Sequence, residues 1–109
     1  MKLNYIKHKI ANLISINKIV SIHYYEFGKN FNYEGESHNF WEMVYVDSGE
    51  VEITANNKPL SLKQGEVIFH KPNEFHTLGT NEKNTANVFV ISFVCSSESM
   101  KFFKGKKMS

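Results

Sequence analysis

The side chains that could do chemistry lie in two short segments that contain histidine and glutamate. The first segment holds Glu36, His38 and Glu42, and the second ends at His76. Imidazole nitrogens and carboxylate oxygens bind divalent transition metals such as Zn, Ni, Mn or Fe, and they also hydrogen-bond small polar molecules. We therefore predict His38, Glu42 and His76 as candidate metal ligands. The same three residues, together with Glu36, are candidate ligand-binding residues.

The spacing of His38 and Glu42 sets a geometric condition for a shared metal ion. Residues four apart on a straight strand lie about 13 Å apart, at roughly 3.3 Å per residue. The two side chains can meet on one ion only if the backbone bends between them. The alternative is that His38 and Glu42 form a hydrogen-bonded pair at the mouth of the fold, because a buried carboxylate needs a partner.

The remaining histidines and the single cysteine receive different predictions. His23 lies in a predicted strand and could point inward, so it joins the ligand-binding candidates. His70 ends another predicted strand and is interpreted as structural, and His8 as a surface residue. Cys95 lies in an apolar run, where a structural role is expected, and one cysteine excludes an internal disulfide. The sequence contains no nucleophile elbow and no glycine-rich phosphate loop.

Short stretches of β-forming residues separated by turn signals run through most of the chain and predict a single all-β domain, either a sandwich or a barrel. Residues 1–17 are predicted as an N-terminal arm or edge segment, 18–95 as the barrel, and 96–109 as the start of a C-terminal helix or a linker. Within the barrel we predict strands over Lys18–Phe27, Phe40–Val46, Glu50–Ala55, Lys58–Lys63, Glu66–His70 and Asn87–Cys95, with Asp47-Ser48-Gly49 ending the second of them.

The predicted strand Phe40–Val46 carries large side chains on both faces. If Glu42, Val44 and Val46 face the interior, then Trp41, Met43 and Tyr45 face outward. A sheet with apolar groups on both faces requires a cover. The N-terminal segment or a second subunit could supply it, so we expect a homodimer as one partner state.

The first segment resembles the first cupin motif. His38 fits the second histidine of that motif, Glu42 follows after three residues, and Gly49 follows after six more. Glu36 stands where the motif has its first histidine. The second cupin motif is matched by Gly65, Pro72 and His76, without the usual glycine between proline and histidine.

The segments 38–49 and 69–76 are also similar to the AraC-type version of these motifs. The resemblance covers residues 18–100 and implies a cupin-type double-stranded β-helix, or jelly-roll, barrel with a short C-terminal helix start. In AraC-type regulators such a domain senses a small polar molecule, often a sugar, and a separate domain binds DNA. The resemblance implies that this chain is a non-enzymatic sensor domain that needs no cofactor. It also implies that the full-length protein contains a DNA-binding domain. The alternatives are a metal-dependent cupin enzyme, such as a dioxygenase or isomerase, and a stand-alone binding cupin.

The charge and hydropathy of the chain disfavour two classes of partner. All 13 basic residues are lysine, and the formal net charge is only +2. Arginine is the preferred residue for reading phosphate or guanine, so direct nucleic-acid binding is not expected. No apolar stretch approaches the roughly 18 residues of a membrane span, and the N-terminus lacks the pattern of a secretory signal. We therefore expect a cytoplasmic protein.

Overall fold

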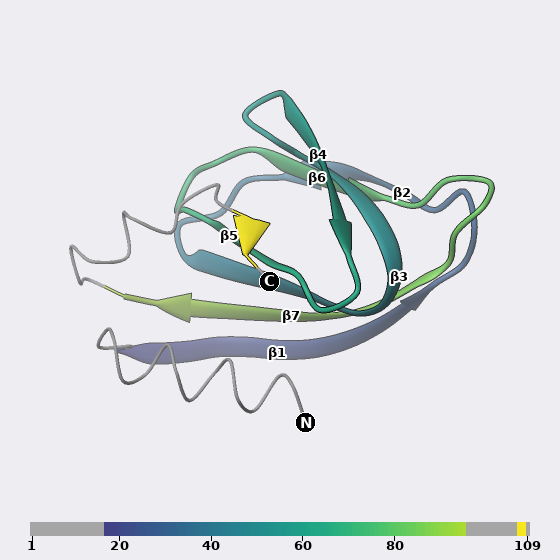
Figure 1. Ribbon diagram of the computed structural model, residues 1–109. Coiled ribbons are helices and arrows are strands. Elements are labelled where there is room, and N and C mark those ends of the chain that lie inside the picture. The colour runs from purple at the N-terminus through teal and green to yellow at the C-terminus, as the bar shows by residue number, and fades with distance from the viewer. Residues whose placement is uncertain (1–16, 96–106, 109) are drawn as a thin grey trace.

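All regular structure in the described residues of the computed structural model, 17–95 and 107–108, is β-strand (Figure 1). The strands are β1 (Lys18–Phe27), β2 (Asn32–Glu36), β3 (Trp41–Ala55), β4 (Lys58–Lys63), β5 (Val67–His70), β6 (His76–Gly79), β7 (Ala86–Val94) and β8 (Lys107–Met108). The all-β prediction is confirmed. Of the predicted arm over 1–17 and the predicted helix start or linker over 96–109, residues 1–16, 96–106 and 109 lie outside the described residues. Lys107–Met108, within the second segment, form a strand and not a helix. The described part of the chain holds no helix with the length and apolarity needed to span a membrane.

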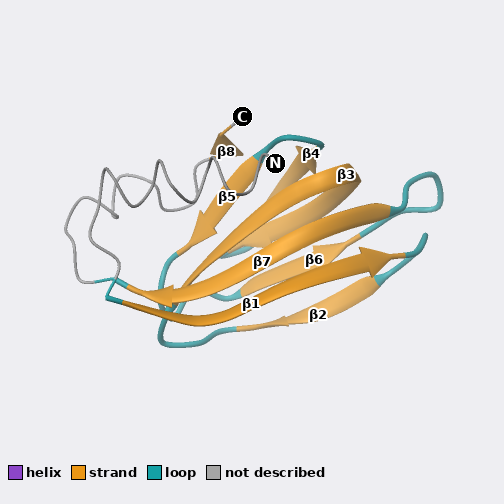
Figure 2. Cartoon of the chain, turned by 90° about the horizontal axis from the view of Figure 1, so that it is seen from below, coloured by secondary structure: helices purple, strands orange, loops and turns teal. Residues whose placement is uncertain are grey.

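The long strand β3 belongs to both sheets of the fold. Its first half pairs with β5 and β7 in one sheet, whose order is β1-β7-β3-β5-β8. Its second half pairs with β4 and β6, and β6 also pairs with β2. All these pairings are antiparallel, and the two sheets lie as layers joined by the curving β3 (Figures 1 and 2). This arrangement is a jelly-roll barrel of the predicted class.

The prediction that Asp47-Ser48-Gly49 ends a strand is wrong. The β3–β7 register shifts between Val46 and Ser48, and Gly49 has φ of 78°, but the strand continues to Ala55. These turn-forming residues produce a β-bulge, which bends a strand without reversing it. The start also differs, because Phe40 lies in a bend that precedes the strand.

The strands β2 and β6 were not expected from the sequence. Their segments, NYEGE and HTLG, contain glycine and few β-branched residues. They form strands because they pair with each other and because β6 also pairs with β3. Tertiary pairing therefore overrides weak local propensity here.

The core consists of two apolar clusters on opposite faces of β3. The inner cluster lies between the sheets and comprises Val44, Val46, Val51, Ile53, Leu62, Ile68, Ala86 and Val88. The outer cluster comprises Trp41, Met43, Tyr45, Val67, Phe69, Ile91 and Phe93. The predicted division of the faces of β3 is confirmed. The outer cluster is buried within a single chain, so it needs no second subunit; the N-terminal segment considered as its cover lies outside the described residues.

Gly49 allows a test of the bulge. A Cβ at this position would overlap the carbonyl oxygen of Thr85 and lie 2.9 Å from the Cα of Ala86, in a left-handed backbone that side chains disfavour. We expect Gly49→Ala to lower the free energy of unfolding by about 2 kcal/mol or more. Urea denaturation measures this loss.

Gly28→Ala is the matched control, because no atom lies within 4 Å of its added Cβ. We expect it to change stability by less than about 0.5 kcal/mol. Equal losses in the two variants would show that the bulge imposes no special constraint.

Candidate functional site

A bend at residues 39 and 40 brings His38 back onto Glu42. His38 lies in the loop before β3, and Glu42 is the second residue of that strand. The ring of His38 stacks on Phe40, with centroids 4.1 Å apart, and its Nε2 lies 3.3 Å from Glu42 Oε1. The geometric condition set by the sequence is therefore met, because the two residues do not share a straight strand.

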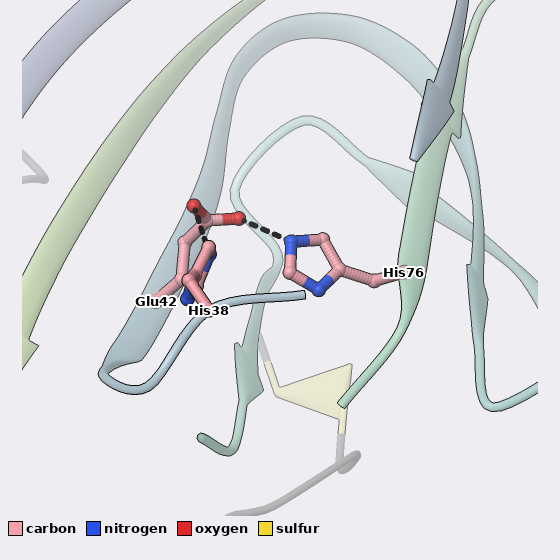
Figure 3. A group of neighbouring side chains, drawn as sticks. All are labelled: His38, Glu42 and His76. Carbon is pink, nitrogen blue, oxygen red and sulfur yellow. Dashed lines mark hydrogen bonds and ion pairs between the residues drawn. The ribbon is translucent and has the colours of Figure 1, made fainter. Parts of the chain in front are cut away.

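His76 reaches the same carboxylate from the opposite sheet. It begins β6, and its Nε2 lies 3.0 Å from Glu42 Oε2. Figure 3 shows one contact from the carboxylate of Glu42 to each of the two rings. One ligand atom from each of His38, Glu42 and His76 lies within 4.8 Å of the others. The structure thus brings together three of the residues that the sequence nominated.

Backbone carbonyls determine which nitrogen of each ring carries a proton. His38 Nδ1 lies 3.1 Å from the carbonyl of Phe40, and His76 Nδ1 lies 3.0 Å from the carbonyl of Glu74. A carbonyl oxygen only accepts, so both Nδ1 atoms donate. In a neutral ring the Nε2 atom is then also an acceptor, and it faces a carboxylate oxygen. A proton or a metal cation between Glu42 and each ring relieves this repulsion.

The ionised form of Glu42 is favoured by its surroundings. Burial raises the pKa of its carboxyl group, but a hydrogen bond from the protonated His76 ring lowers it, as do the charges that His76, His70 and His38 carry when protonated. The net result is a pKa below the usual value. A carboxylate at this position is therefore available to a cation at neutral pH.

His70 and Glu74 form a second layer behind His76. The ring of His70 is 1% exposed and stacks on that of His76, with centroids 4.1 Å apart and planes at 6°. His70 Nδ1 donates to Glu74 Oε1 at 2.9 Å. Burial lowers the pKa of His70, so its ring is neutral near pH 7. The structural interpretation of His70 agrees with this bond but missed its position beside the site.

The register between two predicted strands could have identified His70 as a residue beside the site. In the β3–β5 pairing, its backbone lies directly opposite that of Glu42. Opposed residues in an antiparallel pair point to the same face, so a correct register would have placed His70 beside the candidate ligands. Glu74 carried no such signal, because it lies in the turn between β5 and β6.

A cavity of about 370 Å³ adjoins these residues. Glu42, His70 and His76 form its polar end. Aromatic side chains line much of the rest, namely Tyr25, Phe27, Phe31 and Tyr33. The rings of Phe27 and Phe31 stack with centroids 4.2 Å apart. The cavity can therefore hold a small molecule that has both a polar group and an apolar face.

The other two nominated residues are placed differently. The backbone of Glu36 lies opposite that of His76 in the β2–β6 pairing. His23 is exposed on β1, where its ring stacks on Tyr25 at 5.6 Å. The structure does not bring His23 into the group of metal-ligating atoms or into the wall of the cavity, as far as the described residues show.

A comparison with protein families finds one match. The family model described as "Cupin domain" matches residues 25–93. No curated protein matches the chain.

Several solved structures share the fold. A predicted oxalate decarboxylase from Thermotoga maritima is 18% identical with a TM-score of 0.67, and the match covers 81% of this chain and 73% of that one. The Cnp3 cupin domain of Schizosaccharomyces pombe is 11% identical with a TM-score of 0.67, covering 83% and 66%. The polyketide cyclase RemF from Streptomyces resistomycificus is 20% identical with a TM-score of 0.63, covering 72% and 56%. The chain thus spans only about half of the cyclase and two thirds of the Cnp3 domain.

The buried bond between His70 and Glu74 can be tested by paired substitutions. Glu74→Ala leaves the Nδ1–H of His70 without its acceptor, and we expect a loss of about 1–3 kcal/mol in the free energy of unfolding. Glu74→Gln retains a carbonyl oxygen as acceptor, so most of the stability should remain. Urea denaturation of both variants measures the difference, and equal losses would contradict this role for the carboxylate.

Proposed function

Since the chain belongs to the cupin domain family, we propose that it holds a divalent transition metal on His38, Glu42 and His76 and binds a small polar ligand in the adjoining cavity. The observation that carries the proposal is the convergence of two imidazole Nε2 atoms on one buried carboxylate. Both rings are held in the tautomer that directs a nitrogen lone pair toward that point.

The set of donor atoms fits a metal of this kind. Two imidazoles and one carboxylate on one side leave further positions open, a combination used for Fe(II), Zn and related ions. The carbonyls of Phe40 and Glu74 orient the rings, as second-shell groups commonly do for histidine ligands. When bound, the metal would supply a Lewis acid for an oxygen atom of the ligand.

The cavity supports a ligand with one oxygen-bearing end and one flat apolar face. The oxygen-bearing end would lie near Glu42 and His76, and the apolar face would pack on Phe27 and Phe31. A sugar ring and an aromatic acid both have this character. We assign binding rather than catalysis to the site; a metal-dependent dioxygenase or isomerase is the enzymatic alternative for the same residues.

The second candidate is the sensor domain of an AraC-type regulator. The observation that favours it is the direct contact of Glu42 with both rings, at 3.3 and 3.0 Å, which a shared proton would stabilise without a metal. In this proposal the small polar ligand shifts the protein between two states, and a DNA-binding domain outside these 109 residues responds. The gene sequence beyond residue 109 would test it.

The metal proposal predicts stoichiometric binding. Metal-stripped protein titrated with Co²⁺ should bind one ion and develop the visible absorption of a protein-bound cobalt site. His38→Ala and His76→Ala should each weaken binding by at least about 10-fold, because each removes one ligand. His23→Ala is the matched control and should bind as the unmodified chain does. Absence of saturable binding in the unmodified chain would reject the metal and favour the sensor proposal.

The aromatic wall predicts ligand preference. Benzoate, acetate and glucose can serve as probes with the Co²⁺-loaded protein, measured by calorimetry. If a planar aromatic acid is preferred, benzoate should bind at least about 10-fold more tightly than acetate, since it buries an additional apolar ring. Phe27→Ala should reduce that preference and leave Co²⁺ binding intact. Glucose binding most tightly would assign the cavity to sugars, and no binding of any probe would contradict the ligand proposal.

A further inference from the structure

Four aromatic rings stack on one another along β1 and the segment that follows it. The ring centroids of His23 and Tyr25 lie 5.6 Å apart, those of Tyr25 and Phe27 lie 5.5 Å apart, and those of Phe27 and Phe31 lie 4.2 Å apart. The planes of successive rings differ by only 24°, 14° and 10°. The row is therefore continuous, and the ring of Tyr25 is held between its two neighbours.

The strand register places this row on the face of the sheet that points into the barrel. Tyr25 lies opposite Val88 and Phe27 lies opposite Ala86 in the β1–β7 pairing, and both partners belong to the inner cluster. Opposed residues of an antiparallel pair point to the same face. Tyr25, Phe27 and Phe31 accordingly line the cavity that adjoins the metal-ligand candidates.

The row and the polar end of the cavity lie two strands apart. In the first sheet, β7 separates β1 from β3, which carries Glu42 (Figure 2). Neighbouring strands are about 4.8 Å apart, so the distance across the sheet from β3 to β1 is about 10 Å. A ligand that reaches both must be longer than one ring with its carboxyl group. The cavity volume of about 370 Å³ agrees with this length, because pockets of roughly 300–1,000 Å³ enclose drug-sized molecules.

The cavity reaches the surface at two tyrosines. Tyr25 on β1 and Tyr33 on β2 both line it, and they are 40% and 39% exposed. At the other end, Glu42, His70 and His76 are all buried. A ligand can therefore bury its polar end completely while its far end lies against the tyrosines.

The stacking determines which part of each ring a ligand meets. Rings that lie on one another cover much of each other's faces, so Tyr25 and Phe27 present mainly their edges to the cavity. The edge of an aromatic ring carries partial positive charge, and its face carries partial negative charge. The edges therefore attract the face of an aromatic ligand. A sugar ring has no such face to offer, so the row favours an aromatic ligand over a sugar.

We infer that the ligand of this cavity is an aromatic acid with at least two linked rings, whose carboxylate lies at the end formed by Glu42 and His76 and whose second ring contacts Tyr25 at the mouth. The inference rests on the proposed ligand function and deepens it, because it chooses between the sugar and the aromatic acid considered above. Tyr25 is then the residue that selects for the second ring.

Calorimetric titration with three acids, with and without bound Co²⁺, tests the class of ligand. Biphenyl-4-carboxylate has two aromatic rings, benzoate has one, and 4-cyclohexylbenzoate has a saturated second ring of similar size. We expect biphenyl-4-carboxylate to bind at least about 10-fold more tightly than benzoate, since its second ring buries further apolar surface. It should also bind at least about 3-fold more tightly than 4-cyclohexylbenzoate, because only an aromatic second ring has a face of partial negative charge.

Two adjacent tyrosines provide matched variants. Tyr25 lines the cavity, whereas Tyr24 lies on the opposite face of β1, where its ring contacts Phe89, and the two are similarly exposed. Tyr25→Ala should lower the ratio of biphenyl-4-carboxylate affinity to benzoate affinity at least about 5-fold. Tyr24→Ala should leave that ratio unchanged. Tyr25→Leu keeps apolar bulk without a ring edge, so it should abolish the preference for biphenyl-4-carboxylate over 4-cyclohexylbenzoate.

Four results would overturn the inference. If benzoate binds as tightly as biphenyl-4-carboxylate, the second ring has no site, although the ligand proposal stands. If 4-cyclohexylbenzoate binds as tightly as biphenyl-4-carboxylate, the ring edges make no contribution. If Tyr24→Ala lowers the affinity ratio as much as Tyr25→Ala does, Tyr25 is not the selecting residue. If glucose binds and none of the three acids does, the cavity is a sugar site; if none of these four probes binds, the ligand proposal also fails.

Discussion

Glu42 is only 8% exposed, and both oxygens of its carboxylate face imidazole nitrogens. A buried carboxylate is stable only with compensating positive charge or donated hydrogen bonds. Because backbone carbonyls hold the Nδ1 protons of His38 and His76, the rings cannot turn those donors toward Glu42. The site therefore requires a shared proton or a cation, and this requirement decides which functions the geometry can support.

The path of β3 makes this arrangement possible. The strand passes from one sheet into the other through the bulge near Gly49. Glu42 therefore lies near the start of β3, between β5 and β7, while the second half of β3 pairs with β6. The pairing of Ala55 with His76 fixes the position of the His76 ring along the barrel. The stack of His70 on His76 then limits how that ring can move. Sheet registers thus position Glu42 and His76, whereas His38 is positioned by the loop before β3.

Strand β1 connects the interior of the barrel to its outer edge. Tyr25 and Phe27 lie in the wall of the cavity, while Ile22 and Tyr24 are exposed on the same strand.

The sequence by itself determined the all-β class, the two-faced packing of β3, and the candidates His38, Glu42 and His76, because alternation of side chains and spacing of donor residues are local properties. It misassigned the bulge at Asp47-Ser48-Gly49 and missed β2 and β6, whose pairing depends on distant partners. Only the tertiary structure decided that the backbone bends between His38 and Glu42, that His70 and Glu74 support His76, and that His23 lies outside the cavity wall. Those facts depend on strand register and on carbonyl positions, which no local pattern encodes.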